Sequence, residues 1–184
     1  MAKTIIGDVD LTELYLKRLP DILKDITVSN GFYCSYNKLT SLEGAPSSVG
    51  GNFWCTNNKL TTLNGAPTNV GNNFYCSYNK LTSLENAPKT VGGNFHCDFN
   101  YLTSLEGAPT YVNGRFDCSY NKLTSLIGAP TYVDGNFKCT YNYLTSLEGA
   151  PKTVDGNFYC GTNRVQFTEA QVRAVCDVKG NVYV

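Results

Sequence analysis

The sequence has no excess of charge of either sign, since fifteen lysine and arginine residues balance fifteen aspartate and glutamate residues. Proteins that bind DNA or RNA usually carry a basic excess or a basic face, because the neutralisation of phosphates supplies most of their affinity. The balance therefore argues against a nucleic acid as the partner.

Long apolar runs are also missing. No stretch of the chain approaches the roughly 18 apolar residues that a membrane-spanning helix needs. The N-terminal segment carries Asp8, Asp10 and Glu13 and lacks the apolar region of a signal peptide. We therefore expect a protein without membrane contact that stays in the cytoplasm of the cell that makes it.

Closely spaced cysteine pairs are absent, although the chain has eight cysteines. Seven of them recur at intervals of 21 residues: Cys34, Cys55, Cys76, Cys97, Cys118, Cys139 and Cys160. Disulfide frameworks and zinc sites use close or irregular pairs such as CxxC, so this regular spacing indicates one structural position that is repeated. We expect a buried column of reduced thiols, with no metal site and no cofactor.

A 21-residue unit with the core F-x-C-x-x-N-x-L-x-x-L accounts for this spacing. The seven units begin at Val28, Val49, Val70, Val91, Val112, Val133 and Val154. A fixed period of this length is typical of a stacked solenoid. The Phe and Cys positions, with one residue between them, predict a short strand with one buried face, and stacking would place successive strands about 4.8 Å apart. The asparagine column, from Asn37 to Asn163, is expected to pair buried backbone groups of successive coils.

The unit resembles the leucine-rich repeat, whose strand motif is LxxLxLxxNxL. Phe53, Cys55, Asn58 and Leu60 match its later apolar positions, its asparagine and its last leucine. The resemblance implies a β-rich stack of seven coils with a parallel sheet on a concave face, and we expect the prolines on the convex side. The Gly-Gly pair that follows Val49 departs from the motif, so a parallel β-helix is the alternative fold. The repeated LTSLEGAP and NFYCSYN segments also resemble repeat proteins of tailed bacteriophages, which implies an origin rather than an activity.

The sequence outside the repeats predicts a cap at each end of the solenoid. Residues 1–27 lack the motif but hold spaced apolar residues, and we interpret them as an N-terminal cap. Residues 28–167 contain the seven repeats, the last one partial. Within residues 168–184, Thr168 and Gln171 fit a capping box that opens a short helix, and a final strand is expected from Val182. Caps of this kind cover the open ends of a solenoid.

The column between Phe and Cys is the most informative one for function. Its members are Tyr33, Trp54, Tyr75, His96, Asp117, Lys138 and Tyr159. They change in size and charge while the neighbouring core columns hardly vary, and the alternation of a strand places them on its outer face, with Asp98 and Arg115 beside them. Exposed Trp and Tyr are typical interface anchors, so we predict that these nine residues form the binding face.

Two further columns flank this face. An aromatic ledge lies two residues after Cys, at Tyr36, Tyr78, Phe99, Tyr120 and Tyr141. A basic stripe follows the asparagine column, at Lys38, Lys59, Lys80, Lys122 and Arg164. The strand preference of aromatic residues would account for the ledge, while basic residues beside aromatics could hold a phosphate-bearing ligand.

Two hypotheses about function follow. His96 is expected beside Asp117, but no nucleophile or oxyanion site accompanies this pair, so we expect no enzyme. The first hypothesis is a non-catalytic module that recognises a protein partner; the phage resemblance implies a host protein, such as a defence component, in the host cytoplasm. The alternative is a protein that sequesters a nucleotide or another small anionic ligand.

Overall fold

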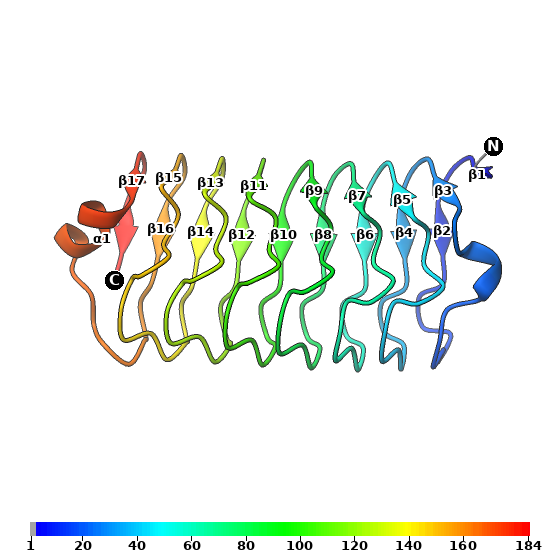
Figure 1. The fold of residues 1–184 in the computed structure, drawn as a ribbon, viewed down its shortest axis with the longest axis horizontal. Helices are drawn as coiled ribbons and strands as arrows, with labels where there is room; N and C mark the ends of the chain where they lie inside the picture. The colour runs from blue at the N-terminus through cyan, green and yellow to red at the C-terminus, as the bar shows by residue number, and fades with distance from the viewer. Residues whose placement is uncertain (1–2) are drawn as a thin grey trace.

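The computed structural model describes residues 3–184, which form a parallel β-solenoid. The stack consists of two nine-stranded parallel sheets, here called sheet A and sheet B (Figure 1). Sheet A contains β1 (Thr4–Ile5), β3 (Thr27–Val28), β5 (Ser48–Val49), β7 (Asn69–Val70), β9 (Thr90–Val91), β11 (Tyr111–Val112), β13 (Tyr132–Val133), β15 (Thr153–Val154) and β17 (Asp177–Val178). Sheet B contains β2 (Val9–Asp10), β4 (Phe32–Tyr33), β6 (Phe53–Trp54), β8 (Phe74–Tyr75), β10 (Phe95–His96), β12 (Phe116–Asp117), β14 (Phe137–Lys138), β16 (Phe158–Tyr159) and β18 (Val182–Tyr183).

The register of the sheets places each repeated residue directly on its equivalent in the next coil. Phe32 pairs with Phe53 in sheet B, and Val28 pairs with Val49 in sheet A. The Phe, Cys, Leu and Val columns are almost completely buried and form one continuous core. Because a large apolar side chain contributes roughly 1.5–3 kcal/mol when fully buried, several such residues in each coil offset the entropy of a chain with little regular secondary structure.

Sheet A occupies the side of the coil on which only an extended, proline-containing segment was expected. Its strands are formed by the valine column, and Pro46 lies buried three residues before Val49. The glycines that follow the valines let the coils approach closely at the corner between the sheets. A Cβ atom on Gly71 would lie 2.0 Å from the carbonyl oxygen of Gly50, so a larger residue there would require the backbone of these coils to shift.

Both terminal segments continue the stack. Strands β1 and β2 pair with β3 and β4, so residues 4–5 and 9–10 add a coil before the first repeat. A short 3-10 helix, η1 (Asp21–Leu23), follows. At the other end α1 (Glu169–Val175) begins with the predicted capping box of Thr168 and Gln171, and β17 and β18 add a last coil. That these ends keep the protein soluble stays a prediction.

The asparagine column bonds successive coils, as predicted. Asn100 is buried, and its Oδ1 accepts a hydrogen bond from the backbone N–H of Leu81 in the preceding coil at 3.0 Å. Its Nδ2 donates to the carbonyl oxygens of Cys76, Cys97 and Asp98 at 3.1–3.2 Å. The amide therefore supplies partners to backbone groups at the bend where the chain leaves sheet B, including the N–H of Leu81.

The cysteine column is buried and unpaired, as expected. All eight cysteines are free thiols with at most about 2% of their surface exposed. Burial raises the pKa of each thiol, to about 11 for Cys160 and Cys176 and further for the inner members such as Cys97. Among residues 3–184, no group of histidine, cysteine and carboxylate side chains could hold a metal ion, and no helix is long and apolar enough to cross a membrane.

Candidate binding face

The outer face of sheet B carries the predicted column as one continuous row. Strand pairing places His96 beside Asp117 and Asp117 beside Lys138, as expected from the sequence. The row also includes Asp10 at one end and Tyr183 at the other, which the sequence analysis did not identify. The full row is Asp10, Tyr33, Trp54, Tyr75, His96, Asp117, Lys138, Tyr159 and Tyr183.

The side chains of the row point outward, but they are less exposed to solvent than the sequence predicted. Trp54 has 38% of its surface exposed, whereas Asp117 has only 9% and is classed with the buried residues. The other predicted members, with Asp98 and Arg115, are half-buried. The physical reason is the close spacing of parallel strands, because each side chain is covered on two sides by its equivalents in the adjacent coils.

The N-terminal half of the row is an aromatic cluster. The rings of Tyr33 and Trp54 meet edge to face with centroids 5.0 Å apart, and Trp54 stacks on Tyr75 at 5.7 Å. Tyr75 in turn lies 4.6 Å from the His96 ring. A shallow hollow of about 620 Å³ lies over this cluster. Its lining consists of Asp10, Thr12, Tyr33, Ser35, Tyr36, Trp54, Thr56 and Tyr75.

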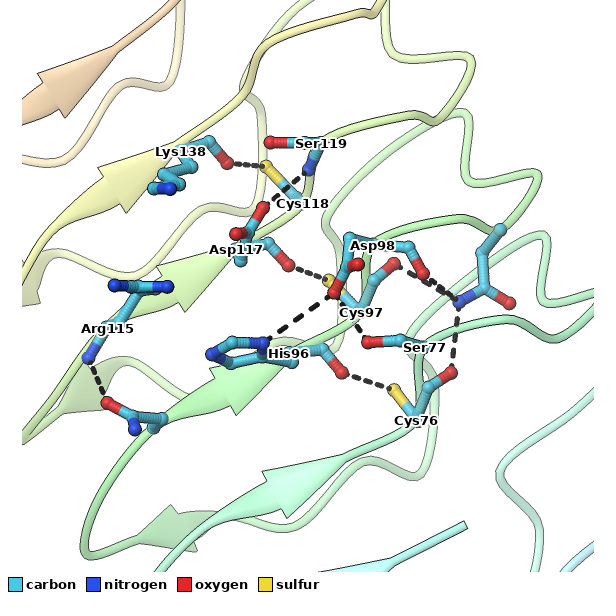
Figure 2. A network of polar contacts seen from close by, with 12 residues as sticks. Cys76, Ser77, His96, Cys97, Asp98, Arg115, Asp117, Cys118, Ser119 and Lys138 are labelled. Atoms are coloured by element: carbon cyan, nitrogen blue, oxygen red, sulfur yellow. Dashed lines mark hydrogen bonds and ion pairs between the residues drawn. The ribbon is translucent and has the colours of Figure 1, made fainter. Parts of the chain in front are cut away.

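The centre of the row is a polar cluster, shown in Figure 2. His96 Nδ1 lies 3.8 Å from Asp98 Oδ1, and Asp98 accepts a hydrogen bond of 2.5 Å from the hydroxyl of Ser77. Asp117 Oδ1 accepts a hydrogen bond of 3.1 Å from the backbone N–H of Ser119. The carboxylates of Asp98 and Asp117 thus accept hydrogen bonds from neutral donors, and the ring of His96 lies beside the carboxylate of Asp98.

The electrostatics of this cluster follow from its partial burial. Burial is the largest effect on His96 and lowers its pKa. The negative charges of Asp117 and Asp98 act in the opposite direction, whereas the positive charges of Arg115 and Lys138 lower the pKa further. Burial also disfavours the charged form of Asp98 and therefore raises its pKa, although the hydrogen bond from Ser77 acts in the opposite direction. His96 Nε2 is buried without a hydrogen-bond partner, so protonation there would place an uncompensated N–H in the cluster.

The polar cluster does not have the order of a hydrolase triad. In such a triad the serine hydroxyl bonds to histidine, which can then accept its proton. Here the hydroxyl of Ser77 donates to Asp98 instead, and the buried thiol of Cys97 donates to the carbonyl oxygen of Asp117. Neither group is therefore arranged as the nucleophile of such a triad.

The aromatic ledge forms a second stack beside the row. Tyr78, Phe99, Tyr120 and Tyr141 stack face to face with centroids 4.2–4.3 Å apart. Strand preference does not explain this column, because its members lie in turns with φ of 53–57° rather than in strands. Such a conformation costs roughly 1–2 kcal/mol for a residue other than glycine, and ring stacking offsets part of this cost. Asn57 interrupts the column between Tyr36 and Tyr78.

The basic stripe is partly engaged with rings of the same chain. Lys38 Nζ lies 5.2 Å from the ring centroid of Tyr15, and Lys122 Nζ lies 4.7 Å from that of Tyr101. In the row itself, Lys138 Nζ lies 4.9 Å from the ring centroid of Tyr159. Several of the protein's lysines thus already make cation–π contacts within the chain.

Comparison with known proteins supports the fold. No protein-family model and no curated protein sequence matches the chain. Among solved structures, a leucine-rich-repeat domain of a Shigella effector is similar, with a TM-score of 0.64 over 95% of this chain and 81% of that domain. The fold is therefore a leucine-rich-repeat-like solenoid, as the repeat predicted. At 19% sequence identity the similarity concerns the fold alone.

Proposed function

We propose that the chain is a non-catalytic module that recognises a protein partner through the outer face of sheet B. One observation carries this proposal: the outward column of sheet B changes in size and in the sign of its charge, from Trp54 to Asp117 to Lys138, while the core columns beside it stay constant. Packing constrains the core columns, so an outward column that changes between a large aromatic residue, an acid and a base is expected where a partner sets the requirements. Aromatic anchors beside charged groups are also the composition of interface hot spots.

The resemblance to phage repeat proteins supports a finer proposal about the partner. We propose that it is a protein of an infected bacterial cell, such as a component of its defence, and that binding takes place in the host cytoplasm. The alternative ligand, a nucleotide or another small anion, has weaker support. Lys38 and Lys122 of the basic stripe already lie over rings of their own chain and are less free to hold a phosphate.

The proposal is tested by cross-linking from the face itself. A photoreactive amino acid replaces Tyr75 in sheet B. In the control it replaces the exposed Thr131, which directly precedes β13 of sheet A. Illumination in a bacterial lysate should give a defined cross-linked protein from position 75 and none from position 131. The purified partner is then titrated against Trp54→Ala, Lys138→Glu and Thr131→Ala.

Truncation of an interface anchor typically costs about 2 kcal/mol or more of binding. Because Trp54 contacts the rings of Tyr33 and Tyr75, its loss should also lower the free energy of unfolding by about 1–2 kcal/mol, and binding is measured where the variant stays folded. If the partner binds both sheet B variants normally but does not bind Thr131→Ala, the interface lies on the side of sheet A and the proposal is wrong. Native mass spectrometry that finds a retained nucleotide and no protein would favour sequestration.

A further inference from the structure

The hollow over the aromatic cluster has a charge pattern that selects one kind of group. Four aromatic side chains line it, from Tyr33 and Tyr36 to Trp54 and Tyr75. Among residues 3–184, Asp10 is the only charged residue that lines it, and no lysine, arginine or histidine belongs to the lining. Rings and a carboxylate both attract cations, because the face of an aromatic ring carries negative charge. The hollow is thus electrostatically complementary to a cation with an apolar surface.

The carboxylate in the hollow is ionised at neutral pH. Asp10 is exposed at the end of β2, and its Oδ1 accepts a hydrogen bond of 2.9 Å from the backbone N–H of Thr12. Hydrogen bonds from Thr12 lower the pKa of Asp10, so the charge persists well below neutral pH. Register places Asp10 directly beside Tyr33, at the end of the aromatic cluster.

Among the described residues, no lysine or arginine lies over the rings that line the hollow. Tyr15, Tyr101 and Tyr159 each have a lysine of the same chain over their ring. Within residues 3–184, no such contact is made with Trp54, although tryptophan is the best ring for it. Tyr36 stacks on no other described ring, because Asn57 takes the next place in the ledge. Tyr36 has 56% of its surface exposed, so a group in the hollow can reach its ring.

We propose that this hollow binds an arginine side chain of the protein partner. Guanidinium is planar and weakly hydrated, stacks on tyrosine and tryptophan, and can donate two hydrogen bonds to one carboxylate. The ammonium of lysine is compact and strongly hydrated, and a quaternary ammonium cannot donate to Asp10. The hydroxyls of Ser35 and Thr56, joined by a hydrogen bond of 3.0 Å, add acceptors at the wall of the hollow. This inference rests on the proposed function, because it names what the partner presents to sheet B.

The chain provides its own reporter for the test. Trp54 is the only tryptophan, so intrinsic fluorescence reports on the hollow directly. The full chain is titrated at constant ionic strength with N-acetyl-arginine methylamide. Matched titrations use the citrulline analogue, which has the same shape without the charge, the lysine analogue, and tetramethylammonium. We expect a saturable change with arginine, no saturable change with citrulline, and weaker binding of the other two cations.

Two variants locate the binding and keep the reporter. Asp10→Asn removes the charge, and Tyr36→Asn copies the Asn57 that the next coil carries with a similar φ, so the turn is retained. Each should weaken arginine binding about threefold or more, in keeping with exposed ion pairs and cation–π contacts. The control, Asp134→Asn, removes an exposed carboxylate away from the hollow and should change nothing.

The outcomes separate this inference from the proposed function. Equal binding of citrulline, or no saturable change with arginine, overturns the arginine assignment even if cross-linking still finds a partner on sheet B. Equal binding of lysine or tetramethylammonium also overturns it, because the hollow would then be a general cation site. Arginine binding that responds to both variants supports it, even if the partner's main contacts prove to lie elsewhere.

Discussion

Replacement of Asn100 by alanine tests whether the asparagine column is structural. The effect can be worked out from the partners that remain. The carbonyl oxygens of Cys76 and Cys97 keep hydrogen bonds from Asn79 and Asn121 at 3.1 and 3.0 Å. The carbonyl oxygen of Asp98 keeps the bond from the backbone N–H of Tyr78 at 3.2 Å. Only the N–H of Leu81 loses its partner.

One buried donor without a partner costs about 1–3 kcal/mol, so we expect Asn100→Ala to lower the free energy of unfolding by about 2 kcal/mol. With a urea dependence of about 2 kcal/mol per molar, the unfolding midpoint should fall by about 1 M. Circular dichroism and Trp54 fluorescence should follow the transition together if the array unfolds cooperatively. The control is Asn72→Ala, since Asn72 is exposed, and its midpoint should change by less than about 0.3 M.

A second variant separates the two functions of the amide. In Asn100→Asp the carboxylate can still accept from Leu81 but cannot donate to the three carbonyl oxygens that surround it. We expect it to be at least as destabilising as alanine, because a buried charge would face three oxygen dipoles. The reasoning would be refuted if Asn100→Ala unfolded at the midpoint of the unmodified chain.

Three further predictions concern the thiols, the C-terminal end and the polar cluster. Because burial raises the pKa of the thiols, titration with a thiol reagent near neutral pH should find few reactive cysteines in the folded chain and all eight after denaturation, whereas rapid reaction of most thiols would contradict the buried column. Deletion of residues 168–184 removes α1, β17 and β18 and uncovers the edges of β15 and β16, so the shortened chain should aggregate; a stable monomer by light scattering would contradict a capping role. Burial lowers the pKa of His96, so below its ordinary value of 6.5 the unfolded chain binds more protons and the folded state loses stability as pH falls. Urea midpoints between about pH 7.5 and pH 5 should therefore fall more steeply than in His96→Asn, and parallel curves would show that His96 does not titrate as inferred.

The sequence was sufficient to predict the stack and its core. A side chain that recurs every 21 residues must lie on its own copies, so the burial of the Phe, Cys and Leu columns follows from the period together with their apolar character. The same logic placed His96, Asp117 and Lys138 in one row. It could not predict sheet A, because the valine is the only recurring apolar residue of each of its strands, whereas Phe and Cys, two residues apart, mark each strand of sheet B.

The terminal coils were missed although the sequence carries a signal for them. Within each repeat the phenylalanine of sheet B stands four positions after the valine of sheet A, as Phe32 does after Val28. Ile5 and Val9 have the same spacing, and so do Val178 and Val182. Ile5 lies in β1 and Val9 in β2, and Val178 lies in β17 and Val182 in β18. The spacing of these two apolar residues, without the cysteine and asparagine of the full repeat, therefore marks the additional coil at each end of the stack.

The contacts within the binding row could not be derived from its register. Adjacent positions suggest an ion pair between Asp117 and Lys138, yet the structure records none between them in the residues that it describes. Lys138 lies over the ring of Tyr159, and Asp117 bonds to a backbone N–H. A long, flexible lysine can reach either neighbour, and a ring that leaves it partly solvated competes well with a carboxylate that is nearly buried. The row is therefore divided into two parts. In its centre, Arg115 and Lys138 accompany the carboxylates of Asp98 and Asp117, which accept hydrogen bonds from neutral donors. In the aromatic end, Asp10 is the only charged residue among the described residues that line the hollow, so positive charge there is left to whatever binds.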